Sequence, residues 1–180
     1  MRDAKLEPDI ISYNAGISAC EQWQRALVLL SEMWEAKLER NAISYNAGIS
    51  ACEKGGQWQR ALALLNEMRE AKLKPNAISY NVGISACEKG EQWQWALALL
   101  SEMKEVKLEP DVISYSAGVH ACEKGGQWQQ ALSILRTMRL RKLDVGFTAY
   151  GTTASMCEQR GHWSQVLFLL REVRDLVTGE

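Results

Sequence analysis

The sequence has almost no excess charge and no long apolar run. Its 21 lysine and arginine residues are balanced by 22 aspartate and glutamate residues, for a formal net charge of −1. A chain without a global basic charge is not expected to bind polyanions strongly and non-specifically. No apolar run approaches the roughly 18 residues that span a bilayer, and the N-terminus lacks a basic region followed by an apolar one. We therefore expect a soluble intracellular protein with no membrane partner.

Side chains that carry chemistry are also scarce. The two histidines, His120 and His162, stand alone, without a recurring acid or nucleophile beside them. The five cysteines form no Cys-x-x-Cys pair and no cluster with histidine, which argues against zinc. We expect no enzyme activity, no catalytic residues, no bound metal and no cofactor.

What the sequence has instead is a tandem repeat. Residues 42–76 and 77–111 differ at only eight of their aligned positions. One tyrosine per copy recurs at intervals of 32, 35, 35 and 35 residues, and the short first interval reflects a missing Lys-Gly-Gly after Glu21. We divide the chain into one array of repeats: a tail of a preceding repeat at 1–9, four repeats at 10–41, 42–76, 77–111 and 112–146, and a degenerate last repeat at 147–180.

Each repeat reads as two helices joined by a glycine turn. Tyr45, Ile49 and Cys52 are spaced as one face of a first helix, Gly55 and Gly56 interrupt it, and apolar residues recur at three-and-four spacing from 58 to 68. Helices of about twelve residues are unstable alone in water, so neighbouring repeats must stack. The sequence therefore predicts an all-α fold, an α-solenoid of helical hairpins.

Recurring residues also predict the packing between hairpins. We expect the cysteines to be reduced core residues, because equivalent helices in a stack lie too far apart for a disulfide: Cys20, Cys52, Cys87, Cys122 and Cys157. Glycine in the middle of the first helix, as at Gly48, predicts the close approach of a neighbouring helix. The tryptophan that begins each second helix, as at Trp23 and Trp163, is expected to pack, whereas Trp34 and Trp95 replace basic residues and are expected to be exposed.

The repeat resembles the pentatricopeptide repeat family. The likeness rests on Ile-Ser-Tyr-Asn near the start of the unit, Cys-Glu-Lys-Gly at the turn, Ala-Leu-x-Leu-Leu and Glu-Met in the second helix, and Lys-Leu-x-Pro-Asp/Asn at its end. It covers essentially the whole chain. The resemblance implies a right-handed superhelix whose first helices bind single-stranded RNA, one base per repeat.

In that family the fifth and last positions of the repeat read the base edge, and the second position packs against the base. The resemblance therefore implies base-reading residues at Asn14 with Asn41, Asn46 with Asn76, Asn81 with Asp111, and, in a repeat that departs from the pattern because Gly146 is its partner, Ser116. The residues implied to pack against the bases are Ile11, Ile43, Ile78 and Ile113. The family's code predicts pyrimidine, pyrimidine and uracil for the first three repeats. The alternative for the last position is that it only caps the following helix.

A lysine near the end of the first helix matches a position that the family turns toward phosphate: Lys54, Lys89 and Lys124. Each follows a glutamate, so a solvated surface turn is the alternative.

Two functions follow from these patterns. The first is a sequence-preferring single-stranded RNA-binding module that acts in organellar RNA processing, stabilisation or editing, in a chloroplast or mitochondrion. No transit peptide is recognisable, and one would belong to a longer parent. The second is a protein–protein interaction scaffold that binds no nucleic acid, which would suit the neutral charge. Uncapped repeats also allow self-association.

Overall fold

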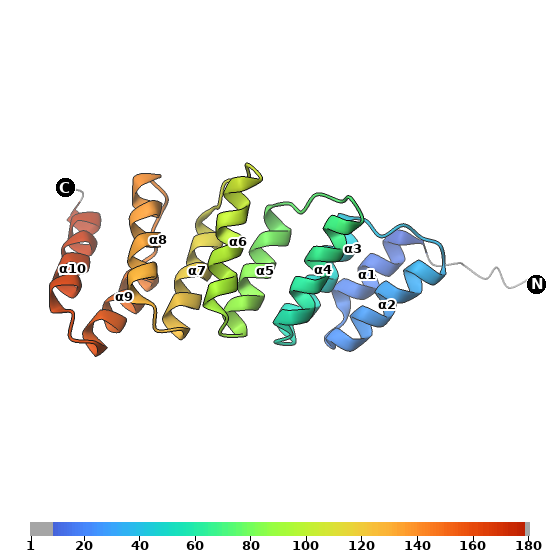
Figure 1. Cartoon of the computed structure of the whole chain (residues 1–180), viewed down its shortest axis with the longest axis horizontal. Coiled ribbons are helices and arrows are strands. Elements are labelled where there is room, and N and C mark those ends of the chain that lie inside the picture. Colours follow the sequence, from blue (N-terminus) through green and yellow to red (C-terminus); the bar gives the residue numbers. More distant parts are fainter. Residues whose placement is uncertain (1–8, 179–180) are drawn as a thin grey trace, which may run out of the picture. The chain divides into compact units, whose positions relative to one another are not determined.

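The computed structural model describes residues 9–178, and these residues form ten helices (Figure 1). The expected tail of a preceding repeat lies outside them, apart from Asp9. The helices alternate between the first and second members of five hairpins. Their bounds are α1 Ile10–Ala19, α2 Trp23–Glu35, α3 Ala42–Lys54, α4 Trp58–Glu70, α5 Ala77–Lys89, α6 Trp93–Glu105, α7 Val112–Lys124, α8 Trp128–Leu140, α9 Phe147–Gln159 and α10 Trp163–Thr178. The predicted all-α fold of paired helices is confirmed.

The helices belong to two compact units, the first ending at Ala86 and the second beginning at Cys87. In the first unit α3 packs on both helices of the hairpin before it, α1 and α2, as well as on its own partner α4. In the second unit α9 packs in the same way on α7, α8 and α10. The recurring element of the fold is thus a hairpin whose first helix is seated on the preceding hairpin.

The first helix of a hairpin is capped at its N-terminus by a side chain, as α3 and α7 show. The Asn41 side chain accepts from the backbone N–H groups of Ile43 and Ser44, and Asp111 accepts from that of Ser114. In both cases the serine hydroxyl accepts in return from the backbone N–H of the cap residue, which satisfies two donors that the helix leaves open. The expected capping role of the last repeat position is therefore confirmed at these two helices.

The turns inside the hairpins require a left-handed backbone. Gly56 has a φ of 67°, and the following Gln57 N–H donates to the Cys52 carbonyl at 2.8 Å. The same bond closes the turn after α5, where Gln92 donates to Cys87 at 2.8 Å, but there the left-handed position is occupied by Glu91 with a φ of 58°. Glycine adopts this conformation at little cost, whereas a residue with a Cβ is strained in it.

The mid-helix glycines are sites of close helix packing, as expected. A Cβ added to Gly48 would come within 2.4 Å of Leu30 Cδ1 in the preceding hairpin and 3.2 Å of Leu64 Cδ1 in its own. A Cβ on Gly118 would meet Leu100 Cδ1 at 2.6 Å. A leucine of the previous hairpin occupies the space that a side chain would need, so these positions favour glycine.

The cysteine prediction holds for four of the five residues. All five thiols are free, and the four at the later positions are buried: Cys52, Cys87, Cys122 and Cys157. Cys20 is only half-buried, so its expected core position is wrong. The cause is the missing Lys-Gly-Gly, because α1 ends at Ala19 and the cysteine that would lie inside a longer helix caps its end instead.

Candidate nucleic-acid interface

In the second repeat, residues 42–76, the side chains at the fifth and the last position are hydrogen-bonded to each other. Asn46 on α3 accepts a hydrogen bond from the Ser79 hydroxyl through Oδ1, at 2.6 Å, and its Nδ2 donates to Asn76 Oδ1 at 3.4 Å. Asn76 also caps α5, because its Oδ1 accepts from the Ser79 backbone N–H at 3.0 Å. Capping and pairing with the fifth position therefore coexist in one residue. The serine hydroxyl fixes which end of the Asn46 amide is which.

The equivalent pair of the first repeat is arranged differently. Asn14 is only 9% exposed, and its Oδ1 has no hydrogen-bond partner in the part of the chain that the structure describes. The Ser44 hydroxyl lies 3.1 Å from Asn41 Oδ1, as that of Ser79 does from Asn76 Oδ1, but it makes no bond to the Asn14 Oδ1 atom. Base reading by Asn14 and Asn41 stays a prediction, and in this arrangement the Asn14 amide is covered.

The other fifth positions are half-buried. These are Asn81 on α5 and Ser116 on α7, whereas the last-position residue Asp111 is exposed at the start of α7. Partial burial leaves part of the surface of each residue accessible, which a base-reading residue would need.

The second position carries an exposed apolar residue in four repeats. Between 60% and 76% of the surface of each of these isoleucines is accessible: Ile11, Ile43, Ile78 and Ile113. All four lie in the first turn of a first helix, two residues before the tyrosine of that helix, which is half-buried in the first repeat and buried in the other three. A solvent-exposed isoleucine at the same position of four hairpins buries little apolar area in the fold, so these side chains are available for contacts at the surface.

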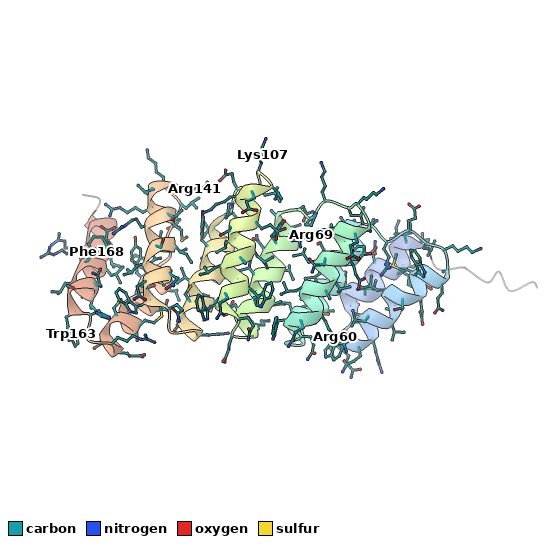
Figure 2. The ribbon with its side chains drawn as sticks, in the orientation of Figure 1. Arg60, Arg69, Lys107, Arg141, Trp163 and Phe168 are labelled. Atoms are coloured by element: carbon teal, nitrogen blue, oxygen red, sulfur yellow. The ribbon has the colours of Figure 1, made fainter. Side chains whose placement is uncertain are left out.

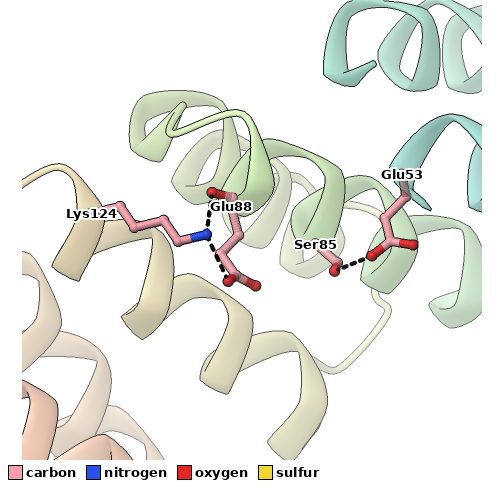
Figure 3. A network of polar contacts seen from close by, with 4 residues as sticks. All are labelled: Glu53, Ser85, Glu88 and Lys124. Atoms are coloured by element: carbon pink, nitrogen blue, oxygen red, sulfur yellow. Dashed lines mark hydrogen bonds and ion pairs between the residues drawn. The ribbon is translucent and has the colours of Figure 1, made fainter. Parts of the chain in front are cut away.

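Lys54 and Lys124 differ in their partners. Lys124 Nζ lies 3.3 Å from the Glu88 carboxylate and donates to the Glu88 carbonyl at 3.2 Å (Figure 3). Glu53, the glutamate at the same position one repeat earlier, accepts from the Ser85 hydroxyl at 3.0 Å. Lys54 is exposed, and no ion pair to it is present within residues 9–178. Lys54 is thus the more available of the two for an added anion.

Two features of this surface escaped the sequence reasoning. The serine at the third position is fully buried in the three repeats with the Ile-Ser-Tyr pattern that follow the first, at Ser44, Ser79 and Ser114. A cation also covers the tyrosine of the next repeat: Arg69 Cζ lies 5.8 Å from the ring centre of Tyr80, and Lys104 Nζ lies 5.7 Å from that of Tyr115. The recurrence of serine was visible in the sequence, whereas the cation–ring pairs depend on the stacking of hairpins.

Two negative findings bound the chemistry of the described residues. Between 9 and 178, no three histidine, cysteine or acidic side chains gather as a metal site would require. In the same range even the longest helix, α10 with 16 residues, is too short and too polar to cross a bilayer.

The fold is similar to solved pentatricopeptide repeat structures. The pentatricopeptide repeat domain of Arabidopsis thaliana protein-only RNase P 1, in complex with tRNA, superposes with a TM-score of 0.83 at 17% identity, covering 95% of this chain and 91% of that one. PPR10 from maize superposes with a TM-score of 0.73 at 23% identity, covering 95% of this chain but only 25% of that one. PPR10 in complex with an 18-nt psaJ RNA element gives 0.74 at 19%, covering 96% and 26%. This chain thus spans about a quarter of the PPR10 structures.

Family models locate the repeats in the sequence. The PPR repeat family matches residues 40–89, the PPR repeat matches 78–108, and the pentatricopeptide repeat domain matches 98–145. No curated protein matches the chain significantly. The three matched segments together extend over more than half of the sequence, and the helical hairpins agree with them. The chain belongs to the pentatricopeptide repeat family.

Proposed function

We propose that this chain is a single-stranded RNA-binding module that reads one base per repeat and prefers pyrimidines. The observation that carries the proposal is the Asn46 amide, which is oriented by the Ser79 hydroxyl beside Asn76. Two solved structures of similar fold contain RNA, a tRNA in one and an 18-nt element in the other. Both are less than 20% identical to this chain, so the proposal depends on the residues of the site.

The chemistry of the amide favours a base that offers an acceptor. With Oδ1 engaged by Ser79 and one Nδ2 hydrogen directed at Asn76, the second Nδ2 hydrogen of Asn46 is left to donate. The carbonyl oxygens of uracil and the O2 and N3 atoms of cytosine are such acceptors, and RNA-binding proteins read unstacked bases along these edges. By the family's code, the pairing of Asn46 with Asn76 then specifies a pyrimidine, and that of Asn81 with Asp111 specifies uracil.

The exposed isoleucines and the lysines complete the proposed site. Ile43 and Ile78 would contact the face of a base, and Lys54, Lys89 and Lys124 would lie near its phosphates. At about 1–3 kcal/mol for each recognised or stacked base, a few readable repeats give modest affinity. By family we infer an organellar setting, a mitochondrion or chloroplast, for RNA processing, stabilisation or editing. Imaging of the tagged natural protein in cells would check the compartment.

Titration of the chain with labelled oligo(U), oligo(C) and oligo(A) at two salt concentrations tests the proposal. Binding should favour both pyrimidine strands over oligo(A), weaken with salt, and fall for Asn46→Ala and Asn81→Ala. Asn66→Ala is the matched control, because Asn66 is an exposed asparagine on the second helix α4. Equal binding of all three strands, or none, would overturn the proposal.

A protein-binding scaffold is the second candidate, and Trp34 favours it. This side chain is 71% exposed on α2, with the Arg40 guanidinium 5.5 Å from its ring centre. Exposed tryptophan beside arginine is typical of protein interfaces. The candidate predicts that no RNA strand binds and that Trp34→Ala abolishes capture of a protein partner.

A further inference from the structure

The first helices of the second, third and fourth repeats each carry a line of three polar side chains. Residues four apart in a helix lie above one another on the same face. In all three helices the fifth and ninth positions of the repeat are half-buried, and the thirteenth is exposed. We call these positions the polar stripe. Its members are Asn46, Ser50 and Lys54 on α3, Asn81, Ser85 and Lys89 on α5, and Ser116, His120 and Lys124 on α7.

The polar stripe of α7 differs from the other two, although the buried side of the helix is largely unchanged. Tyr115 and Cys122 in the core match the residues at the same positions of α3 and α5. Two of the three stripe residues have changed, to Ser116 and His120. The last position of the repeat, where the second repeat has the amide that pairs with Asn46, has also become Gly146. The fourth repeat has thus changed its accessible chemistry while keeping its core.

These changes remove from the fourth repeat the polar groups that the second repeat presents. Ser116 has no amide, and Gly146 has no side chain. Lys124 Nζ lies 3.3 Å from the Glu88 carboxylate and is engaged by it (Figure 3). The third polar side chain of this stripe is His120, whose imidazole makes no hydrogen bond, ion pair or ring contact within residues 9–178. Its ring nitrogens are therefore available to a ligand.

His120 lies between the two ends of the polar stripe. At a rise of about 1.5 Å per residue, the ninth position is about 6 Å along the helix from both the fifth and the thirteenth. In the proposed mode of binding, a base lies at the fifth position and a phosphate near the thirteenth. An imidazole between them can donate to a phosphodiester oxygen, and in its protonated form both ring nitrogens donate. The serine at this position of α3, Ser50, offers only a neutral hydroxyl.

Few charged groups surround this imidazole. On its own helix they are Glu123 and Lys124, and at the end of α5 they are Glu88 and Lys89. The segments of α6, α8 and α9 that lie beside the second half of α7 carry no charged residue: 93–99, 128–134 and 151–156. Histidine is the side-chain type that gains a proton between about pH 8 and pH 5. The charge of this part of the surface therefore changes with pH through the imidazole.

We propose that His120 binds a phosphodiester group of single-stranded RNA and supplies the charge that Lys124, held by Glu88, does not supply in the fourth repeat. The inference rests on the proposed function, because it assigns a further residue of the same surface. Protonation of the imidazole adds a positive charge at the contact, so the affinity for RNA rises as the pH falls. The contact is with the backbone and leaves the preference among bases unchanged.

Fluorescence anisotropy of the full chain with labelled oligo(U) at pH 5.5 and pH 8 tests the proposal, because uracil and the phosphodiester group do not titrate in this range. The wild type should bind about two- to fivefold more tightly at pH 5.5. Its slope of log affinity against log salt should be steeper there by about 0.7, as for one added phosphate contact. His120→Ser restores the residue of the other stripes and should remove both differences. His120→Arg carries a permanent charge and should bind at pH 8 about as tightly as the wild type at pH 5.5.

His162→Gln is the matched control, since the chain has only these two histidines. The ring centre of His162 lies 4.3 Å from that of Trp128. Figure 2 locates His162 by the next residue, Trp163, which is 57% exposed, so the expected packing of Trp163 is wrong. Glutamine holds the position of His162 in the three preceding repeats, at Gln57, Gln92 and Gln127. This variant should keep the pH dependence of the wild type.

The results separate this inference from the proposed function. Binding of oligo(U) that does not change with pH, or that changes equally in the wild type and in His120→Ser, would overturn the role of His120 and leave the proposed function standing. A changed preference between oligo(U) and oligo(A) in His120→Ser would also overturn it, because His120 would then contact a base. No RNA binding at either pH would overturn the proposed function and the phosphate contact together.

Discussion

The Ser79 hydroxyl lies 2.6 Å from Asn46 Oδ1 and so joins the helix that begins one repeat to the fifth position of the repeat before it. Ser44 has the same capping role, but among residues 9–178 its hydroxyl makes no bond to the fifth-position Asn14. Comparing the two serines therefore separates orientation of the amide from helix capping.

Ser79→Ala should therefore lower the preference for pyrimidine strands, because the Asn46 amide loses the bond that orients it. Loss of the capping contact should also cost about 1 kcal/mol of stability. Ser44→Ala should cost similar stability and leave the strand preference unchanged. Oligonucleotide titration and thermal unfolding of both variants check this, and an equal loss of preference in the two would contradict it.

Gly48→Ala should destabilise the stack by about 1–3 kcal/mol, because the new methyl group overlaps the buried Leu30 side chain. Gly151 on α9 has nothing within 4 Å of its would-be Cβ, so Gly151→Ala should instead stabilise by up to about 1 kcal/mol through helix propensity. Urea unfolding of the two variants should give shifts of opposite sign; shifts of the same sign would show that propensity alone decides.

Glu91→Gly should raise the melting temperature. Glu91 is held at a φ of 58° in a turn where three other repeats carry glycine, at Gly56, Gly126 and Gly161, and relief of that strain is worth about 1 kcal/mol. For a chain of this size such a gain corresponds to roughly 2–4 °C. The reverse change, Gly56→Ala, meets no atom within 4 Å and should lower the melting temperature by a similar amount.

Alkylation should distinguish Cys20 from the buried thiols. Burial raises the pKa of Cys87 and of Cys122 to about 12, and it also raises the pKa values of Cys52 and Cys157. The thiolate is the reactive form, so at pH 8 these thiols stay protonated and unreactive in the folded chain. Mass spectrometry after brief iodoacetamide treatment should find label on the half-buried Cys20 first, and on the others only after unfolding.

Lys54→Ala should weaken RNA binding and lower the slope of log affinity against log salt by about 1, as expected for one lost phosphate contact. Lys124→Ala should change the slope less, because Lys124 is already held by Glu88. A larger slope change for Lys124 would contradict the proposed use of these lysines.

Most of the fold could be predicted from the sequence because the residues that make each packing contact recur at the same positions of several repeats. The spacing of Tyr45, Ile49 and Cys52 predicted the buried face of α3, and the mid-helix glycines predicted close packing. Prediction failed where a residue lacks the packing that its copies have: Cys20 is half-buried beside the missing turn, and Trp163, on the last described hairpin, is 57% exposed. Position in the repeat determined the type of residue, but burial depends on the adjacent hairpin.

The candidate site was predictable only in part. The family pattern identified Asn46 and Asn76, and the structure brings their amides together. It did not indicate that Ser79 orients the pair, or that Asn14 is covered, because both depend on how a side chain turns in a particular stack.

The insertion of Leu30 beside Gly48 also bears on how such a chain can change its length. Every complete repeat offers the same leucine and the same glycine, as at Leu65 and Gly83, so removal of residues 42–76 would let Leu30 meet Gly83 as readily as Gly48. We expect the shortened chain to fold, with a smaller denaturant m-value in proportion to the surface lost. Because the contacts between successive hairpins are interchangeable, recombination within the gene could add or delete whole repeats while the surrounding repeats stay folded.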